Sequence, residues 1–320
     1  MGGTRAIPKA LESFITEHGG SVLTNTFITD IDITGNTLTD QKGNTYAYKQ
    51  LIWASDTKAL YRNINYDKLT DSKYKKKLLT KRETLEQYHG GDSIFALYLA
   101  IDLPVSYFSN ISHPHLFYTP KNGGISHIQG TELEKVLDKD PRETTLDERN
   151  IIQVWLTDFL IYMTYEISCP AMHDASLAPE GKTALMVSTL FDYSIAKHIK
   201  EASWYDEFKL FVEDTMVEAL SSSLYTEMRD KILQKFSSTP ITFERMTGNS
   251  EGAITGWAFT KRPLPVVHEM KYIINSVDTP IRNIFQAGQW VFSPSGLPIS
   301  VLTGKLAADK VIKALKKKKR

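Results

Sequence analysis

Residues 283–313 combine the residue types of a cofactor-binding turn. An apolar stretch at Ile284 and Phe285 leads into a turn rich in Gly, Ser and Pro, and helical apolar periodicity begins again at Ile299. Such a strand–loop–helix connection leaves backbone N–H groups free, and the helix adds the positive end of its dipole. The segment therefore predicts a site for a phosphate or for a ring that accepts negative charge. An ordinary strand-to-helix connection has a similar composition, and this second interpretation needs no ligand.

Residues typical of other catalytic chemistries are missing from the sequence. It contains no Ser/His/Asp nucleophile elbow, HExxH motif or P-loop. Its single cysteine, Cys169, excludes a cysteine-based metal cluster and an intramolecular disulfide, and is typical of a reducing compartment. His113 and His115 form an H-x-H pair without a third ligand at a convincing spacing. We expect no metal site, and we identify no catalytic residue.

The composition is that of a globular protein with one large domain or two ordinary ones. The 320 residues are 42% hydrophobic, and the net charge of +1 gives no overall indication of nucleic-acid binding. No run approaches the roughly 18 apolar residues of a membrane-spanning helix, and the N-terminal residues do not form a secretory signal. We therefore expect a cytoplasmic protein. The basic run from Lys316 to Arg320 predicts a solvated tail or, alternatively, peripheral contact with anionic lipid.

Hydrophobic periodicity predicts the elements before the central part of the chain. Residues 4–18 have the spacing of an amphipathic helix, and residues 21–33 are rich in residues that favour strands. A hairpin turn at residues 40–44 and a fully apolar strand at residues 50–54 follow.

Further along the chain, the sequence predicts a polar surface connection at residues 132–150 and an amphipathic helix at residues 204–224. Residues 241–246 have the composition of a strand. Residues 151–167 are the most apolar segment, which would be either plain core or the lining of a cavity for a long apolar ligand.

The C-terminal segment resembles the cofactor segment of the phytoene desaturase and retinol saturase type of FAD-dependent oxidoreductases, in the flavin amine oxidase superfamily. That segment reads AGxW, a glycine-rich turn, GxP and then small residues. The matching positions here are Ala287-Gly288-Gln289-Trp290, Gly296-Leu297-Pro298, Thr303-Gly304 and Ala307-Ala308. The usual glycine turn is Ser293-Pro294-Ser295-Gly296 in this chain, which limits how closely the backbone can approach a ligand.

Two further stretches resemble the same family. The positions that match its adenine-contacting strand are Gly20, Val22, Asn25, Ile28 and Ile31. Those that match a phrase of its substrate domain are Pro170, Asp174, Ala178-Pro179, Gly181 and Lys182.

The resemblance implies FAD as the cofactor and assigns candidate contacts to it. Ile28 would contact the adenine through its backbone, although a strand core residue is an equal interpretation, and Ser55 would lie on the flavin side of the sheet. Gly288 and Gln289 would lie on the phosphate–ribityl side. The turn after them would hold the ring through Gly296 and the N–H groups of Leu297 and Ile299, with Pro298 setting the helix entry.

Aromatic residues near this segment are candidates for the substrate side. Trp257 and Phe259, in a glycine-rich loop, could face the flavin or an isoprenoid, and Trp290 follows the cofactor turn. Aromatic residues in such loops are as often packing residues, so both interpretations are open.

The resemblance also implies an α/β fold that is α+β in the middle. A discontinuous, Rossmann-like FAD-binding domain would comprise residues 1–56 and 249–320, with an inserted substrate domain of mixed sheet and helices at residues 57–248. The family's GxGxxG unit is not in this sequence. We therefore expect the C-terminal portion of a flavoprotein with an incomplete FAD domain, whose N-terminal half could be a separate chain, and an exposed sheet edge near residues 50–54.

The first functional hypothesis is an FAD-dependent desaturase, saturase or isomerase that acts on an apolar isoprenoid or carotenoid-like substrate and is incomplete without an N-terminal nucleotide-binding segment. A non-catalytic fragment that binds an apolar ligand or a partner protein is the alternative from another class. A flavin amine oxidase is a third; it would need an aromatic pair flanking the flavin, and only Trp257 points to one.

Overall fold

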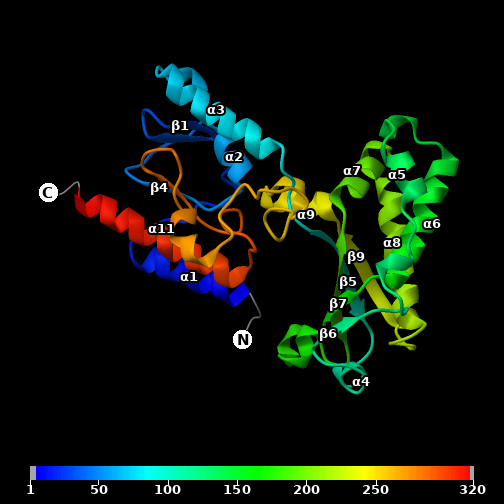
Figure 1. The fold of residues 1–320 in the computed structure, drawn as a ribbon. Helices are drawn as coiled ribbons and strands as arrows, with labels where there is room; N and C mark the ends of the chain where they lie inside the picture. Colours follow the sequence, from blue (N-terminus) through cyan, green and yellow to red (C-terminus); the bar gives the residue numbers. More distant parts are fainter. Residues whose placement is uncertain (1–4, 318–320) are drawn as a thin grey trace. The chain divides into compact units, whose positions relative to one another are not determined.

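The computed structural model of the chain describes residues 5–317 (Figure 1). It divides into two compact units, each made of two segments: Met1–Ser21 with Ile94–Thr242, and Val22–Ser93 with Phe243–Arg320. Both units combine helices with sheet, so the expected α/β class is confirmed. Residues 57–93, expected in the inserted domain, pack in the second unit with the cofactor-side segments.

The second unit is built on two short parallel strands, β4 (Leu51–Trp53) and β10 (Ile284–Gln286). Leu51 N donates to Asn283 O at 2.8 Å, and Ala287 N donates to Trp53 O at 2.9 Å. Among residues 5–317, no other strand pairs with β4. The predicted strand at residues 50–54 is therefore present, and one of its edges carries no neighbouring strand within the described part of the chain.

Further elements of the second unit surround this pair of strands. They are a three-stranded antiparallel sheet of β1 (Ile28–Asp32), β2 (Thr37–Asp40) and β3 (Thr45–Ala47), and the helices α2 (Thr57–Arg62), α3 (Ser72–Glu86), α10 (Ile273–Ser276) and α11 (Leu297–Lys317). Ile284 of β10 packs in one hydrophobic cluster with Trp53, Leu60 and Leu78. Ala287 packs with Ala307 of α11 in another. The parallel pair thus has a hydrophobic cluster on each side.

The first unit contains a five-stranded sheet in the order β6-β7-β8-β5-β9. Its strands are β5 (Ser93–Ile101), β6 (His115–Tyr118), β7 (Tyr165–Ser168), β8 (Thr183–Phe191) and β9 (Ile232–Ser238). Its helices are α4 (Val105–Ser109), α5 (Thr131–Leu137), α6 (Leu146–Tyr162), α7 (Tyr193–Glu201) and α8 (Tyr205–Ser221), and the unit also includes α1 (Ala6–Glu17), which buries none of its residues. Helices α5 to α8 lie on one side of the sheet (Figure 1). The core between them contains alternate side chains of the strands, such as Phe95, Leu97 and Leu99 of β5.

Two local predictions differ from the structure. Residues 241–246, predicted as a strand, belong to helix α9 (Pro240–Thr247). Pro240 opens this helix, and Thr239 and Thr242 each accept from the other's backbone N–H through their hydroxyl oxygens, at 3.4 and 3.2 Å. This capping outweighs the β propensity of the sequence.

The second difference concerns residues 132–150, while the neighbouring residues 151–167 had two open interpretations. The first range, predicted as a connection, holds α5 and the start of α6, where Thr145 and Glu148 form a capping box. The second range is split between α6 and β7. Buried side chains of α6, including Ile152, Leu156 and Leu160, are part of the core, which favours the core interpretation of this segment.

No helix among residues 5–317 is long and apolar enough to cross a membrane. The basic run that ends at Arg320 falls mostly outside the described residues, so its proposed lipid contact stays a prediction.

The turn between β2 and β3 depends on the carboxylate of Asp40. It accepts from Lys42 N at 2.8 Å, from Asn44 N at 2.9 Å and from Tyr46 Oη at 2.9 Å. Hydrogen bonding, first of all from the Asn44 side chain, lowers the pKa of Asp40 from 3.8 to about 2. The charged form of this carboxylate therefore stabilises the folded state.

We predict that Asp40→Asn lowers the midpoint of thermal unfolding by a few degrees at pH 7. Because the folded pKa lies below the ordinary value, the stabilisation is complete above about pH 4 and is lost as the pH falls toward 2. The difference between variant and wild type, measured by circular dichroism, should shrink over that range. Asp67→Asn, at a fully exposed carboxylate, is the control. A difference independent of pH would contradict this role of Asp40.

Candidate cofactor site

The carboxyl ends of the two parallel strands, where α/β proteins bind nucleotide cofactors, carry the first group of predicted residues. Ala54 and Ser55 are exposed at the end of β4. Gly288 follows β10, and a Cβ atom added to it would lie 3.5 Å from Ala54 O. Gly288 has φ +93°, a conformation that favours glycine. The pairing of β4 with β10 therefore brings Ser55 close to Gly288, although they are far apart in the sequence.

Thr303 ties this turn to α11. Gly288 N donates to Thr303 Oγ1 at 3.1 Å, and the same hydroxyl donates to Ile299 O at 2.8 Å. Thr303 is fully buried. The N–H of Gly288 is thus already used inside the protein, and Gly288 shapes the turn through its backbone conformation. The sequence indicated Thr303 only as one of the small residues of the family pattern.

The side chain of Gln289 also has a structural partner. Its Nε2 donates to Ala253 O at 3.0 Å. The main-chain carbonyl oxygen of Gln289 lies against Gly256, where an added Cβ atom would come within 2.3 Å of it. Gly256 has φ +76°, so only glycine fits this close approach. Ser295 Oγ donates to Thr255 O at 2.5 Å. The glycine-rich loop and the cofactor turn therefore hold each other in place, a contact that the sequence did not predict.

The start of α11 is open to solvent. Gly296, Leu297 and Pro298 are exposed, with 63% of the Leu297 side chain accessible, and Ile299 is half-buried. The first N–H groups of a 21-residue helix have no partner within the helix, so an anion or an electron-rich ring can accept from them. Just before them, the hydroxyl of Ser293 is buried without a hydrogen-bond partner. This part of the predicted site has the donors and the accessibility that such a ligand requires.

The predicted aromatic residues lie in two different environments. Trp257 and Trp290 are each 1% exposed and pack edge to face with their ring centres 5.0 Å apart. Trp257 Nε1 donates to Trp290 O at 2.9 Å, and Trp290 Nε1 donates to Asn249 Oδ1 at 3.0 Å. Packing and these hydrogen bonds account for the burial of both tryptophan side chains. Phe259 is 52% exposed, with the Arg262 guanidinium 5.9 Å from its ring centre.

Ile28 lies at the first position of β1, opposite Asp40 in the register. Its carbonyl oxygen accepts from Asn63 Nδ2 at 2.7 Å, and its side chain packs against the cluster around Trp53. Ile28 is thus a strand residue that packs in this cluster, and its contact with an adenine stays a prediction.

The two histidines that could have suggested a metal site are not part of a ligand cluster. His115 begins β6, and its Nε2 lies 2.7 Å from Glu166 Oε1. Among the described residues, no group of three or more His, Cys, Asp or Glu side chains is arranged to hold a metal ion.

Asp56 fixes the end of β4 and is a structural residue of the site. Its carboxylate is 1% exposed and accepts from Lys58 N and Ser250 N, each at 2.6 Å. Trp53 Nε1 donates to Asp56 O at 2.7 Å. One side chain therefore caps α2 and joins it to the loop that contains the glycine-rich turn. The helix cap could be predicted from the sequence, but the bond to Ser250 could not.

Comparisons with known proteins agree with this architecture. No protein-family model matches the chain. Curated phytoene desaturases of Fusarium fujikuroi and Gibberella fujikuroi are 19% identical over 165 residues, which is 47% of this chain and 28% of theirs. Among solved structures, an oxidoreductase from Methanosarcina mazei superposes with a TM-score of 0.56 at 15% identity, covering 98% of this chain and 54% of its own.

A putrescine oxidase redesigned in its cofactor binding superposes with a TM-score of 0.57 at 13% identity, and the match covers 98% of this chain and 53% of that one. The chain thus spans about half the length of these solved structures and less of the curated relatives. At these identities the solved structures establish the fold, which this chain shares with oxidoreductases. The resemblance to phytoene desaturases noted from the residues is confirmed as a similarity of sequence.

We predict that Asp56→Ala lowers the free energy of unfolding by roughly 2–4 kcal/mol, because two backbone donors lose a buried charged acceptor. Asp71→Ala is the matched control. Asp71 caps α3 through a single bond to Tyr74 N at 3.0 Å and is exposed, so about 1 kcal/mol is expected there. Urea unfolding measures both values. Equal losses would contradict the linking role of Asp56.

Proposed function

We propose that the chain is part of an FAD-dependent oxidoreductase of the phytoene desaturase type, acting on an apolar isoprenoid or carotenoid-like substrate. The observation that carries the proposal is the meeting of three elements at one edge of the parallel sheet: the end of β4 at Ser55, the Gly288 turn and the exposed start of α11. Nucleotide cofactors bind at this edge in α/β proteins. The residue pattern at these places and the similarity to phytoene desaturases both support FAD.

The residues present fit part of a flavin site. The unused N–H groups at the start of α11, from Leu297 and Ile299, would hold the flavin ring, and the helix dipole would stabilise negative charge on it. Ser55 would lie on the flavin side of the sheet, and Gly288 on the phosphate–ribityl side. Pro298 has no N–H to donate and fixes the direction in which the helix begins. When bound, the flavin supplies the hydride chemistry, while the protein binds, orients and excludes water.

The sheet of the first unit supports an apolar substrate. One face is covered by helices, and apolar side chains are also present on the other, including Phe117, Met186, Leu190 and Phe236, all exposed. Tyr98 of β5 stacks on Phe236 of β9 with the ring centres 4.8 Å apart. Antiparallel sheets usually have a polar face when that face meets only water. The exposed apolar side chains share this face with the His115–Glu166 pair, and an exposed apolar patch is typical of a surface that binds an apolar molecule.

Neither alternative function has an observation of its own in its favour. A flavin amine oxidase would need aromatic side chains exposed on both sides of the flavin, whereas Trp257 and Trp290 are buried against each other. A non-catalytic fragment that binds an apolar ligand would share the open sheet face but would not bind FAD. The affinity for FAD separates that alternative from the proposal.

We predict that Leu297→Asp weakens FAD binding at least tenfold in a flavin-fluorescence titration of the purified chain. A carboxylate at the start of α11 favours the helix through its dipole but repels an anionic or electron-rich ligand, so binding should fall without loss of stability. Val301→Asp places the same charge one turn further along the exposed face and should have a smaller effect. Equal effects would contradict the proposed position. A chain that retains no FAD after free FAD is removed by gel filtration would contradict the proposal for this chain.

We also propose that the free edge of β4 pairs with a strand of a dinucleotide-binding segment, which would complete the pyrophosphate site. In a parallel pair, alternate residues direct their N–H and C=O groups to opposite sides. Leu51 N and Trp53 O bond to the β10 side, so the N–H of Ile52 points to the free edge. Ile52 is 36% exposed. Such an edge is prone to accept another strand.

We predict that in the isolated monomer the amide of Ile52 exchanges with solvent much faster than those of Leu51 and Ala287, which donate to Asn283 O and Trp53 O across the β4–β10 pair. Hydrogen exchange followed by NMR at single residues measures the difference. A dinucleotide-binding segment that pairs with β4 should slow the exchange of Ile52 alone. Full protection of Ile52 in the isolated monomer would contradict the free edge.

A further inference from the structure

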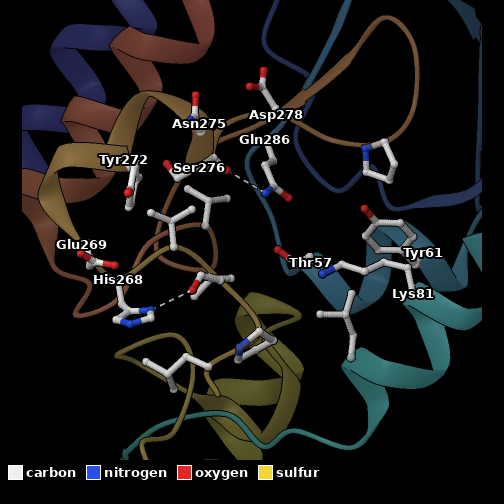
Figure 2. A pocket seen from close by; sticks show the side chains of 17 residues that line it. Thr57, Tyr61, Lys81, His268, Glu269, Tyr272, Asn275, Ser276, Asp278 and Gln286 are labelled. Atoms are coloured by element: carbon white, nitrogen blue, oxygen red, sulfur yellow. Dashed lines mark hydrogen bonds between the residues drawn. The ribbon is translucent and has the colours of Figure 1, made fainter. Parts of the chain in front are cut away.

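The second unit contains a cavity of about 500 Å³ that is separate from the candidate cofactor site. Side chains of α2, α3, β10 and the loop at residues 264–280 line it, and Figure 2 shows them pointing inward from these elements. None of the candidate cofactor residues is among them. Its volume is within the range of small-molecule sites in proteins, roughly 300–1,000 Å³.

One part of the lining presents polar groups without partners. Thr57 is 3% exposed, and its Oγ1 is buried and has no hydrogen-bond partner among residues 5–317. Tyr61, one helical turn further along α2, points to the same cavity (Figure 2). Burial raises the pKa of Tyr61 well above its usual range, so its hydroxyl stays protonated and can donate. A buried hydroxyl without a partner normally costs free energy, which a ligand that accepts from it would recover.

Lys81 of α3 adds a positive charge to this part of the cavity. Its side chain points into the space beside Thr57 and Tyr61 (Figure 2). Among residues 5–317, no acceptor lies within hydrogen-bond or ion-pair distance of its ammonium group. Burial lowers the pKa of Lys81 from 10.5. A partly buried cation without a counter-charge favours an anion from outside the protein.

The acidic side chains in the lining do not neutralise Lys81, because each pairs with another lysine. Glu269 Oε2 lies 2.7 Å from Lys271 Nζ, and Asp278 Oδ2 lies 2.6 Å from Lys310 Nζ. The remaining lining has an apolar part, which includes Leu85, Leu264, Pro265, Val266, Val267 and Val291, and a polar part made of His268, Asn275, Ser276 and Gln286. The cavity thus combines one cationic, hydrogen-bonding region with an apolar wall.

We propose that this cavity binds an amphipathic anion, with its carboxylate or phosphate head at Lys81, Thr57 and Tyr61 and its hydrocarbon part against residues 264–267. The charge of Lys81 selects the head group, and the two hydroxyls supply the directional hydrogen bonds. The apolar wall provides the hydrophobic part of the affinity. This site does not depend on the proposed flavin function.

The test is calorimetric titration of the full chain with decanoate, decyl phosphate and the neutral decanol, each below the concentration at which it aggregates. Both anions, or one of them, should bind at least tenfold more tightly than decanol. The better anion identifies the head group. Equal affinity for decanol and for both anions would overturn the proposal, as would a failure of all three to bind.

Lys81→Met keeps the length and apolar stem of the side chain and removes its charge. It should reduce the anion affinity at least tenfold and leave decanol binding unchanged, and Thr57→Val should reduce the anion affinity several-fold. Lys77→Met, at an exposed position one turn earlier on α3, is the control and should leave both affinities unchanged. Thermal unfolding checks that each variant is folded. Anion binding that survives Lys81→Met in folded protein, or that falls equally with Lys77→Met, would overturn the assignment.

Discussion

The second unit depends on the parallel pairing of β4 with β10, two strands of three residues that come from opposite ends of the chain. Next to this pair of strands, Gln50 Nε2 donates to Asn283 Oδ1 at 3.3 Å, although the two residues lie 233 positions apart in the sequence. Closing so long a loop has an entropic cost that three-residue strands cannot offset alone. Hydrophobic clusters on both sides of the pair and the carboxylate of Asp56 supply the additional stabilisation. The proposed cofactor edge exists only because this pairing forms.

The same pairing joins the two segments of the second unit, which lie on either side of residues 94–242 in the sequence. The first unit has its own core between a five-stranded sheet and its helices, and the described core contains no residue of the second unit. Under the proposed function, the first unit would present its sheet face to the substrate, and the second unit would form the cofactor site.

The elements that could be predicted from the sequence are those with a pattern in their own residues. The apolar strand at residues 50–54, the hairpin turn at residues 40–44 and the helix at residues 204–224 have clear periodicity or turn residues, and all are present. The helix at Pro240–Thr247 was missed because its β-branched and aromatic residues resemble a strand, and only the capping by Thr239 decides otherwise. Propensity is a weak guide where a cap or tertiary packing acts against it.

The candidate site was predictable only in part, for a physical reason. Glycine and proline at the turn after β10 indicate an unusual backbone, and the structure has positive φ at Gly288 and an exposed helix start at Leu297. Which backbone N–H groups already have a hydrogen-bond partner depends on the tertiary structure. Neither the bond from Gly288 N to Thr303 nor the burial of Trp257 against Trp290 can be read from spacing. The cavity at Lys81 could not be predicted for the same reason, because the lysine-rich sequence of α3 is typical of a solvent-exposed helix.

The most direct test of the central claim, a flavin site at the start of α11, is photolabelling of the chain with 8-azido-FAD, followed by mass-spectrometric mapping of the adducts. Adducts are expected within residues 288–299 or next to Ser55, and excess FAD should prevent them. Adducts confined to other segments, or labelling that excess FAD does not reduce, would contradict it.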